Sequence, residues 1–362
     1  MAGGQFGDMI DIEFYQKFSD LVESEFRGAK SKDEVFNMLE EIRSREPIIY
    51  NIETTNRCNM RCQMCPRTAM MTRGIEDISY TTFKDIVDQI KPHTEDSWNK
   101  WKKFCEQKYG IYENGKPSEN HFFLYIISKV IQLHGYGDPL LDKNMSSYIE
   151  LLSERNIQSY FSCNPANIDL DASYRMIDSG LSYLKYSVES IDSSVHSQIR
   201  NDKKNIRESI EQIYNIINYR DRKQANTTIV ITMLDLNRKN QTEDFQLLRE
   251  AFEGYDVYIY LKSEDCMWVR GEYHLNKSIH WNEVCKHPWM TMTIKSNGEA
   301  TMCMEDFNNE IILGNASHEK LIDIWNGEKY MEFRRKHIMG DEHFRCSQRC
   351  DMNLLSDYLN SK

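Results

Sequence analysis

Three cysteines stand close together near the start of the chain. Cys58, Cys62 and Cys65 have the spacing C-x3-C-x2-C, and they follow a segment of strand character at residues 47–53. A strand that ends in such a loop would bring three thiolates together around one metal centre. Thiolates are the usual ligands of iron–sulfur clusters, and a [4Fe–4S] cluster held by three of them keeps one iron open for another ligand. This stretch therefore predicts a reactive cluster rather than one that only stores or transfers electrons.

A second pair of cysteines, Cys285 and Cys303, flanks a predicted β-hairpin. The two cysteines are 18 residues apart, and the residues at 290–302 have strand character on both sides of the dipeptide Asn297-Gly298. This dipeptide is the strongest short signal for a hairpin turn, because both residues tolerate the positive φ angles that such turns need. A hairpin here would bring Cys285 close to Cys303.

Two further cysteines, Cys346 and Cys350, follow a predicted helix at residues 320–337. With the hairpin pair they form a set of four thiolates, which is enough to enclose a second [4Fe–4S] cluster completely. Zinc is the alternative for this set, because four cysteines suit it equally well. Zinc is a weaker alternative for the first set, since it would need a fourth local ligand and the nearest histidine is His93.

The composition limits the classes of protein that this chain can belong to. It has 362 residues, a net charge of −11 and ten cysteines, and no apolar run approaches the roughly 20 residues of a membrane span. The acidic balance disfavours a nucleic-acid partner, which would need a basic surface. The first residues lack the basic start and apolar core of a signal peptide, so we expect a cytoplasmic protein. In that reducing compartment, grouped cysteines indicate metal rather than disulfides.

Strand and helix patterns alternate between the two cysteine groups. Apolar and β-branched runs predict strands at 47–53, 122–133, 157–163, 184–192, 227–234 and 255–261. Amphipathic spacing predicts helices at 80–91, 145–154, 172–179, 206–219 and 245–252. This alternation predicts an α/β fold, with a parallel sheet and outer helices arranged as a partial (β/α)6 barrel. Active residues of such folds gather at the carboxyl ends of the strands.

These patterns divide the chain into three predicted parts. They are a helical extension at 1–46 with helices at 11–26 and 31–44, the barrel at 47–262, and a small domain of a β-hairpin and a helix at 263–362. Residues 93–120 are polar with scattered aromatic side chains, and we interpret them as an insertion that is either a lid or partner surface or a decoration. A peptide-binding role for the extension is disfavoured, because no strands precede its helices.

At the first cysteine group the chain resembles the radical S-adenosylmethionine (SAM) superfamily. The resemblance implies that Cys58, Cys62 and Cys65 hold a [4Fe–4S] cluster, and that SAM binds the open iron through its amino and carboxylate groups. One electron would then cleave SAM to a 5′-deoxyadenosyl radical, which abstracts a hydrogen atom from the substrate. Met64 stands where this family usually has an aromatic residue, and we expect it to pack near the adenine.

A glycine-rich segment carries the same resemblance. His134-Gly-Tyr-Gly-Asp-Pro139 is similar to the GGEP segment of the family, with Tyr136 in the place of a glycine and Asp138 in the place of a glutamate. By that similarity Gly137 and Asp138 receive the amino group of SAM, and the glycines allow the backbone to approach the ligand closely. An ordinary strand-to-helix turn is the alternative.

Residues after the next two predicted strands complete the implied SAM site. Asn164 follows the strand at 157–163 and is a candidate for polar contact with SAM or the substrate. The strand at 184–192 resembles the family's Val-Ser-Leu-Asp strand, which implies that Ser187 lies near the ribose of SAM and Arg200 near its carboxylate. An arginine fork suits a carboxylate. A surface salt bridge is the alternative for Arg200.

The C-terminal cysteines lie in a region that resembles the auxiliary-cluster segment of SPASM and twitch radical SAM enzymes. The similar runs are Cys303-Met-Glu-Asp-Phe307, Leu313-Gly-Asn315 and Leu321-Ile-Asp-Ile-Trp325. Four cysteines fit the shorter twitch type, with one auxiliary [4Fe–4S] cluster. The most similar type is the aminocyclitol dehydrogenase of the butirosin pathway, which implies that Arg270 and Glu305 contact the substrate. A structural ion pair is the alternative for each of them.

We interpret the chain as a radical SAM oxidoreductase that dehydrogenates a secondary alcohol of a sugar or cyclitol. The auxiliary cluster would take the second electron, and a flavodoxin or ferredoxin-type protein would be the reductant. Cys266, just past the sixth predicted strand, could instead return a hydrogen atom to the substrate, which would make the protein an epimerase; a buried thiol is the alternative. The same motifs could also belong to a peptide-modifying enzyme, or to a non-catalytic iron–sulfur or zinc protein. Cys105 and Cys163 have no spacing partner and are expected to pack in the interior.

Overall fold

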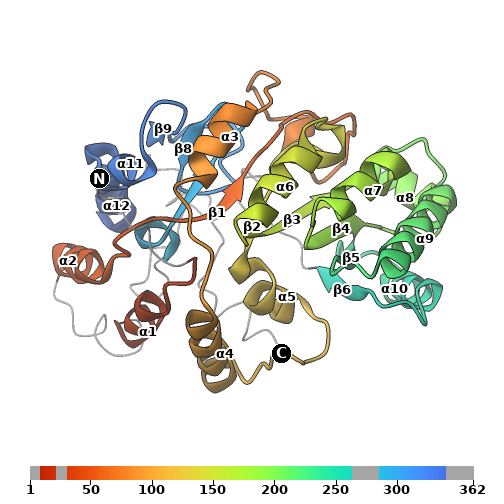
Figure 1. Cartoon of the computed structure of the whole chain (residues 1–362), viewed down its shortest axis with the longest axis horizontal. Coiled ribbons are helices and arrows are strands. Elements are labelled where there is room, and N and C mark those ends of the chain that lie inside the picture. The colour runs from red at the N-terminus through yellow and green to blue at the C-terminus, as the bar shows by residue number, and fades with distance from the viewer. Residues whose placement is uncertain (1–8, 22–30, 263–284, 340–362) are drawn as a thin grey trace.

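A single sheet runs through the protein. The computed structural model describes residues 9–21, 31–262 and 285–339 (Figure 1). Their nine-stranded sheet has the order β6-β5-β4-β3-β2-β1-β7-β8-β9. The strands are β1 Ile48–Ile52, β2 Val130–Gln132, β3 Gln158–Cys163, β4 Tyr183–Ser187, β5 Thr228–Leu234, β6 Tyr258–Lys262, β7 Thr291–Ile294, β8 Glu299–Thr301 and β9 Gly314–Asn315.

The first six strands pair in parallel with their neighbours, as the alternating sequence pattern predicts. The register sets Cys163 beside Tyr186, and Ser187 beside Thr232. Because parallel strands share one direction, their carboxyl ends meet at one edge of the sheet. The segments that the sequence marks as functional follow directly after β1, β2, β3 and β4, so they all begin at this edge.

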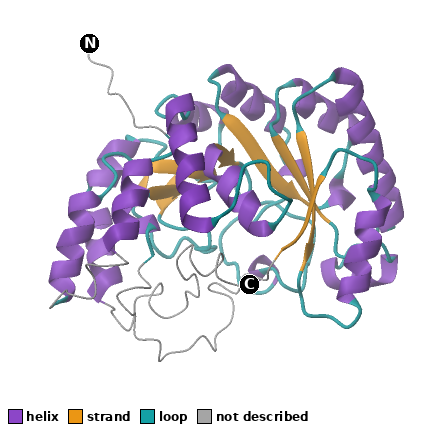
Figure 2. Ribbon diagram, turned by 90° about the horizontal axis from the view of Figure 1, so that it is seen from below, coloured by secondary structure: helices purple, strands orange, loops and turns teal. Residues whose placement is uncertain are grey.

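Helices cover the outer side of the curved sheet (Figure 2). They are α3 Tyr80–Val87, α6 Met145–Glu154, α7 Leu170–Asp178, α8 Ser193–Arg200, α9 Ile206–Lys223 and α10 Gln241–Ala251. Their apolar residues recur at helical spacing and are buried against the strands; in α9 these include Ile206, Ile210, Ile213 and Ile217. Apolar burial between helices and sheet is the main favourable contribution to this layered arrangement.

Two helices precede the sheet, as the sequence predicts. α1 Ile12–Asp20 starts after Asp11, whose carboxylate accepts a hydrogen bond from the N–H of Phe14 at 2.9 Å. α2 Lys32–Ile42 starts after Ser31, whose hydroxyl accepts from a backbone N–H three residues on. The two helices share a separate apolar core with Trp289. No strand lies in the described residues ahead of β1.

The expected insertion at residues 93–120 contains a packed helix, α4 Glu95–Tyr109. Trp101 is buried on its inner face, and the ring of Trp101 lies 4.6 Å from the ring of Tyr15 in α1. Cys105 is also fully buried there, as expected of a packed thiol. α4 therefore joins the insertion to the N-terminal helices, and a lid or partner role for the segment stays a prediction.

The predicted strand at 122–133 is wrong in its first half. Residues Glu119–Tyr125 form a helix, α5, and β2 begins only at Val130. The hydroxyl of Ser118 starts the helix by accepting from the N–H of His121 at 3.1 Å. An apolar run of this length suits either a helix or a buried strand, and tertiary contacts decide between them.

α5 closes the amino-terminal end of the barrel. Phe122 packs in a cluster with Val130, Tyr160 and Tyr258, so one side chain contacts residues of β2, β3 and β6. The imidazole of His121 also hydrogen-bonds the hydroxyl of Tyr258 at 2.9 Å. The helix therefore packs inside the barrel against residues of both β3 and β6.

The predicted hairpin forms, and it joins the barrel sheet. β7 and β8 pair around Gly298, which has φ +82° and so needs the conformational freedom of glycine. β7 also pairs in parallel with β1, with Ile49 opposite Met292 and Asn51 opposite Thr293. The strand that precedes the first cysteine group is therefore hydrogen-bonded to the strand that follows Cys285.

The predicted helix at 320–337 is divided in two. Its parts are α11 Leu321–Asn326 and α12 Glu328–Met339. Gly327 between them has an extended backbone, and glycine is a poor residue for a helix interior. The break lets Trp325 and Tyr330 pack edge to face, with ring centroids 4.7 Å apart.

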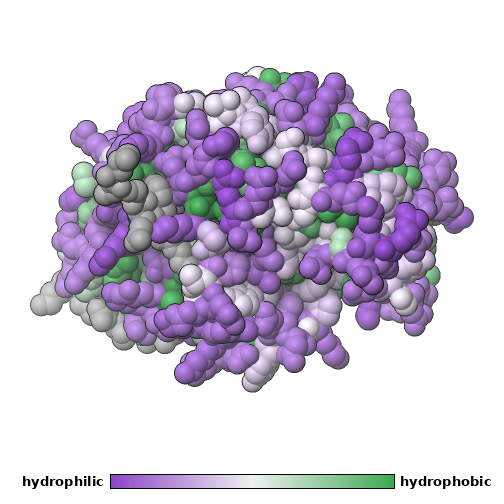
Figure 3. All heavy atoms as spheres, viewed as in Figure 1, coloured by the Kyte–Doolittle hydropathy of each residue, from purple (hydrophilic) through white to green (hydrophobic). Residues whose placement is uncertain are grey.

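The outer surface is mostly hydrophilic, with apolar side chains scattered singly over the face shown in Figure 3. None of the described helices combines the length and the apolar character needed to cross a membrane.

The closure of the barrel by α5 makes a stability prediction. We expect Phe122→Ala to lower the free energy of unfolding by about 3–5 kcal/mol, because it leaves a cavity among the aromatic residues at the end of the barrel. Tyr112→Ala is the matched control, since this aromatic side chain of the same segment is exposed, and it should change the value by less than about 0.5 kcal/mol. Urea unfolding followed by fluorescence measures both, and equal effects would contradict the packing role of Phe122.

Candidate functional site

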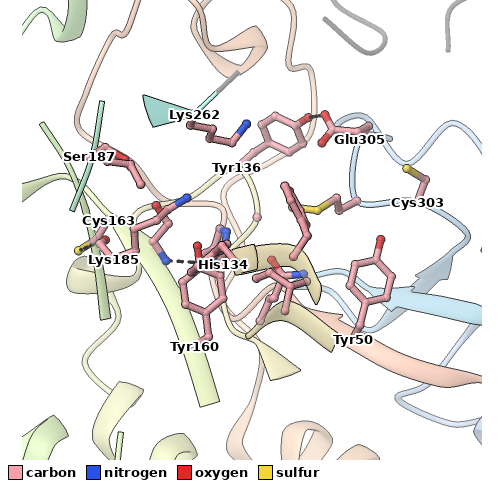
Figure 4. Close-up of a pocket in the computed structure, with 18 of the residues that line it drawn as sticks. Tyr50, His134, Tyr136, Tyr160, Cys163, Lys185, Ser187, Lys262, Cys303 and Glu305 are labelled. Carbon is pink, nitrogen blue, oxygen red and sulfur yellow. Dashed lines mark hydrogen bonds between the residues drawn. The ribbon is translucent and has the colours of Figure 1, made fainter. Parts of the chain in front are cut away.

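A cavity of about 500 Å³ opens at the carboxyl ends of the strands. All the described residues that the sequence assigns to the site line this cavity. They are Cys58, Cys62, Met64, Cys65, Gly137, Asp138, Asn164, Ser187, Arg200, Cys285, Cys303 and Glu305. Figure 4 shows the interior, with side chains of β3 and β4 on one side and Tyr50 and Cys303 on the other. The two cysteine groups therefore face one shared space.

The loop after β1 carries the first cysteine group. The backbone N–H of Cys65 donates to the carbonyl of Cys62 at 3.2 Å, and a short 3-10 turn at Pro66–Thr68 follows. Burial raises the pKa of the Cys58 thiol to about 11 and also raises that of Cys65. A metal-bound thiolate must lose its proton, so these thiols need a positive centre to ionise. Among the described residues no three metal-ligating side chains converge on a point suited to one ion.

A buried carboxylate fixes the start of this loop. Glu53 is fully buried one residue after β1, and both of its oxygens accept from Nη2 of Arg73 at 2.9 Å. It also accepts from the N–H of Tyr136 at 2.9 Å and from the N–H of Ser296 at 3.2 Å. Burial would raise the pKa of Glu53, but the charges of Lys295 and Arg73 outweigh burial and lower it. Glu53 is therefore an ionised anchor for three loops.

The sequence analysis missed Glu53. Its only sequence signal is an acidic residue directly after an apolar strand, and that pattern alone does not show what the residue contacts. Its partners Tyr136 and Ser296 lie 83 and 243 residues further along the chain.

The glycine-rich segment after β2 packs tightly against the cysteine loop. A Cβ atom on Gly137 would lie 2.1 Å from the carbonyl oxygen of Thr55, which is far closer than atoms can approach. The N–H of Asp138 donates to the carbonyl of Arg57 at 2.7 Å. Only glycine fits at position 137, and the two loops are held as one unit.

Asp138 holds the turn after β3. Its buried carboxylate accepts from Nδ2 of Asn167 at 2.7 Å, from the N–H of Leu140 at 3.1 Å and from the N–H of Asn164 at 3.3 Å. Burial raises the pKa of Asp138, and these hydrogen bonds oppose the shift. The three donors that Asp138 accepts from all belong to the protein. Contact of Asp138 with the amino group of SAM therefore stays a prediction.

Asn164 presents a buried donor to the cavity. Its Oδ1 accepts from the N–H of Ala166 at 2.9 Å, whereas its Nδ2 is buried and has no hydrogen-bond partner among the described residues. A buried polar group without a partner costs free energy, so such a group in a cavity wall is suited to a ligand. Ser187 lines the same cavity at the end of β4.

Arg200 connects the first cysteine group to the fully buried Glu189. Its Nη2 forms an ion pair with a carboxylate oxygen of Glu189, and its Nη1 lies 3.7 Å from Sγ of Cys62. The salt bridge considered as the alternative for Arg200 is therefore present, but it is buried rather than at the surface. The contact of Arg200 with the carboxylate of SAM stays a prediction. The Nε atom of Arg200 is also buried, with no hydrogen-bond partner in the described part of the chain. Because Arg200 ends α8, the helix sets its position.

The second cysteine group lies beside Tyr50. Burial raises the pKa of the Tyr50 phenol well above its usual value, and the charges of Cys303, Glu305 and Cys285 add to the shift. Burial likewise raises the pKa of the Cys285 thiol to about 12 and lowers that of Lys286 to about 8. Cys285 and Cys303 thus lie near each other, as the hairpin predicts.

A hydrogen bond joins the two halves of the site. The hydroxyl of Tyr136, in the glycine-rich segment, donates to Oε2 of Glu305 at 2.5 Å (Figure 4). The ring of Tyr136 lies 5.7 Å from that of Phe307. Sequence analysis treated Tyr136 only as a departure from a family pattern, whereas in the structure it positions Glu305.

The interior wall formed by β3 to β6 contains polar residues that the sequence analysis also missed. Lys185 of β4 and Lys262 of β6 line the cavity, and His134, which follows β2, lies beside them. Cys163 packs as expected, with its thiol 3.5 Å from the carbonyl of Lys185. A lysine inside the apolar strand Tyr-Leu-Lys-Tyr-Ser was the available signal, because few strands bury a charge without a reason.

Four predicted site residues lie outside the described residues. They are Cys266, Arg270, Cys346 and Cys350. Their predicted roles stay predictions, and so do the fourfold cysteine set and the thiol of an epimerase.

Comparisons with known proteins concern two things, the C-terminal segment and the fold of the whole chain. Residues 285–351 match the family model SPASM, described as an iron-sulfur cluster-binding domain. No curated protein sequence is similar enough to match the chain. Streptococcus suis SuiB bound to S-adenosylmethionine is 12% identical, with a TM-score of 0.53 over 89% of this chain and 78% of that one.

Two other solved structures are similar at lower scores. BtrN in complex with AdoMet and 2-DOIA is 15% identical, with a TM-score of 0.46 over 84% of this chain and 97% of that one. The protein anSMEcpe with bound AdoMet is 12% identical, with a TM-score of 0.48 over 78% of this chain and 81% of that one.

These findings confirm the predicted fold. The chain has the α/β fold of SuiB, as predicted from the resemblance to radical SAM proteins. The match of residues 285–351 to the iron-sulfur cluster-binding SPASM model confirms the predicted SPASM-like region at the C-terminal end of the chain.

The close approach at Gly137 makes a prediction for ligand binding. We expect Gly137→Ala to push the glycine-rich segment away from Thr55, which should lower the free energy of unfolding by about 1–3 kcal/mol. SAM affinity, measured by equilibrium dialysis with the reconstituted protein, should fall at least about tenfold, which corresponds to about 1.4 kcal/mol.

Gly74→Ala is the matched control for this experiment. A Cβ atom on Gly74 would meet no atom within 4 Å, so the variant should retain both stability and SAM affinity. Unchanged SAM affinity in Gly137→Ala would contradict the assignment of this segment to SAM binding.

Proposed function

We propose that the protein is a radical SAM oxidoreductase that dehydrogenates a secondary alcohol of a sugar or cyclitol. Cys58, Cys62 and Cys65 would hold a [4Fe–4S] cluster with SAM, and the C-terminal cysteines would hold one auxiliary [4Fe–4S] cluster. The observation that carries this proposal is that the two cysteine groups line a single cavity of about 500 Å³. A substrate in that space would lie between two redox centres.

The residues around the cavity fit such a cofactor. Gly137 leaves room that a Cβ atom would fill, and Nδ2 of Asn164 is a buried donor without a hydrogen-bond partner among the described residues. Arg200 adds a positive charge directly beside Cys62. SAM carries a carboxylate, which matches a guanidinium and an amide donor. These donors support binding of SAM at the first cysteine group.

When bound, the clusters and SAM would supply a 5′-deoxyadenosyl radical for hydrogen abstraction and an acceptor for the second electron. The protein itself positions the substrate and excludes water. Glu305 is suited to accept the proton of the substrate hydroxyl, because it lines the cavity beside the second cysteine group. Tyr136 holds that carboxylate in place through its hydrogen bond.

The electron donor and the cellular setting belong to the same proposal. We infer a flavodoxin or ferredoxin-type reductant, since the proposed chemistry begins with one electron from outside the protein. A cytoplasmic setting agrees with reduced, grouped cysteines. Arg270 would add a second charged contact to the substrate.

Epimerisation is the second candidate function, with Cys266 as the proposed hydrogen donor. In the sequence Cys266 follows four residues after Lys262, which ends β6 and lines the cavity. A thiol could give a hydrogen atom to a substrate radical, and the resulting thiyl would need one electron and one proton from the reductant and solvent.

Iron content tests the two-cluster proposal. We expect about eight irons per chain after anaerobic reconstitution, falling to about four when Cys58, Cys62 and Cys65 are all replaced by alanine. Cys105→Ala is the matched control, because this cysteine is buried in a different core and should leave the iron content unchanged. About four irons falling to none would contradict the proposal, since no auxiliary electron acceptor would remain.

Product analysis in heavy water tests the reaction. The reduced, SAM-loaded protein would be incubated with a panel of hexoses, cyclitols and their phosphate and carboxylate derivatives. Dehydrogenation predicts a ketone two hydrogens lighter than the substrate, with no solvent deuterium at carbon. An epimer carrying one deuterium would overturn dehydrogenation, and loss of that deuterium in Cys266→Ala would then identify the donor.

A further inference from the structure

We propose that the cavity wall formed by β3 to β6 binds an anionic group of the substrate, either a carboxylate or a phosphate. This inference rests on the proposed function, because it names the substrate class of the same site. Two lysines and one histidine carry it. The wall lies across the cavity from Tyr50 and Cys303 (Figure 4).

Lys185 supplies the first positive charge. It lies within β4, where Lys185 and Ser187 both line the cavity, and it is only 6% exposed. Its Nζ lies 5.6 Å from the ring centroid of Phe122 and 5.9 Å from that of Tyr160. Aromatic faces attract an ammonium group, but the burial of a charge remains costly in an apolar site. An anion in the cavity would stabilise this charge further.

Lys262 supplies the second positive charge, from the end of β6. It ends β6, and the strand register sets it beside Leu234. The neighbouring row of residues contains Ser187, Thr232 and Tyr260, which pair across β4, β5 and β6 and all line the cavity. Lys185 lies two residues before Ser187, whereas Lys262 lies two residues after Tyr260. The two lysines therefore flank one row of hydroxyl groups.

His134 adds an uncharged donor. Its Nδ1 accepts from the backbone N–H of Ser162 at 3.3 Å, so the proton of the neutral ring resides on Nε2. Burial and the charge of Lys185 lower the pKa of His134 to about 3, which keeps the ring neutral. An N–H in the same cavity as Lys185 is a suitable donor for an oxyanion.

Three carboxylates of the cavity each hold another group. Glu189 pairs with Arg200, Asp138 accepts hydrogen bonds at the turn after β3, and Glu305 accepts from Tyr136. The two wall lysines lie on β4 and β6, whereas the first cysteine loop follows β1 and the second cysteine group flanks β7 and β8.

This arrangement orients the substrate. An anionic group held by the two lysines and His134 would fix one end of the substrate in the cavity. Two ammonium groups and one neutral donor match the charge of a carboxylate or phosphate and would disfavour a cationic substrate.

The test measures anion binding without turnover. Thermal unfolding of the reconstituted, SAM-loaded, unreduced protein would be followed with inorganic phosphate, with acetate, and with sodium chloride at equal ionic strength. We expect phosphate, acetate or both to raise the midpoint by about 2 °C or more at tenfold excess over Kd, beyond the effect of chloride. A response to phosphate alone would identify a phosphate site, and a response to acetate alone a carboxylate site.

Lysine variants assign the response to the wall. Lys185→Met and Lys262→Met should each reduce the anion-dependent rise by at least half. Lys84→Met is the matched control, because it removes the same charge from an exposed ion pair on α3, and it should respond like the wild type. No rise with either anion, or an equal rise in all three variants, would overturn the inference.

A separate measurement tests the proposed function in the same samples. SAM should alter the electron paramagnetic resonance spectrum of the reduced cluster in the wild type and in both wall variants. A SAM response without an anion response would overturn only the substrate class. Loss of the SAM response in the wild type would contradict the radical SAM function itself.

Discussion

The site depends on the buried carboxylate of Glu53. An ionised group that is fully removed from water is stable only when charges and hydrogen bonds surround it, and Glu53 has both. Its partners belong to the cysteine loop, the glycine-rich segment and the turn between β7 and β8. Removal of one partner from such a buried pair typically costs about 3–5 kcal/mol. The three loops are therefore fixed relative to one another before any ligand binds.

Charge is distributed unevenly around the cavity. Arg200 stands beside the first cysteine group and Lys286 beside the second, whereas Lys185 and Lys262 lie on the wall between them. Each cysteine group thus has its own cation, which favours the thiolate that an iron–sulfur cluster requires. The chain as a whole carries a net charge of −11. The cavity is therefore richer in positive side chains than the acidic composition of the chain would suggest.

Local patterns predict the parts of this structure that local sequence determines. The amphipathic helices of the barrel and the Asn297-Gly298 turn depend on residues within one element, and the structure agrees with them. One exception is α5, where the apolar run at 122–125 suits helix and strand equally and the contact between Phe122 and the barrel decides. The other is the predicted helix at 320–337, which Gly327 divides in two.

Long-range pairs could not be predicted in the same way. Tyr136 and Glu305 are 169 residues apart, and the type of one residue does not predict contact with the other. Lys185 is recognisable as a charge inside an apolar strand, but only the sheet register shows that it shares one wall with Ser187 and Lys262. The residues that position the site cannot be predicted from a single sequence, because the topology of the fold decides which residues they contact.

The pairing of β1 with β7 has a consequence for the distance between the two cysteine groups. Ile49 faces Met292 and Asn51 faces Thr293, so β1 contains one more residue than β7 over this span, and Tyr50 is the extra residue of a β-bulge. A bulge redirects a side chain, and here it directs Tyr50 toward Cys285 and Cys303. The spacing of the two cysteine groups is therefore measured in steps of backbone register rather than by a flexible linker. A deletion of one residue in β1 would remove this bulge and shift the first cysteine loop by one strand position relative to β7.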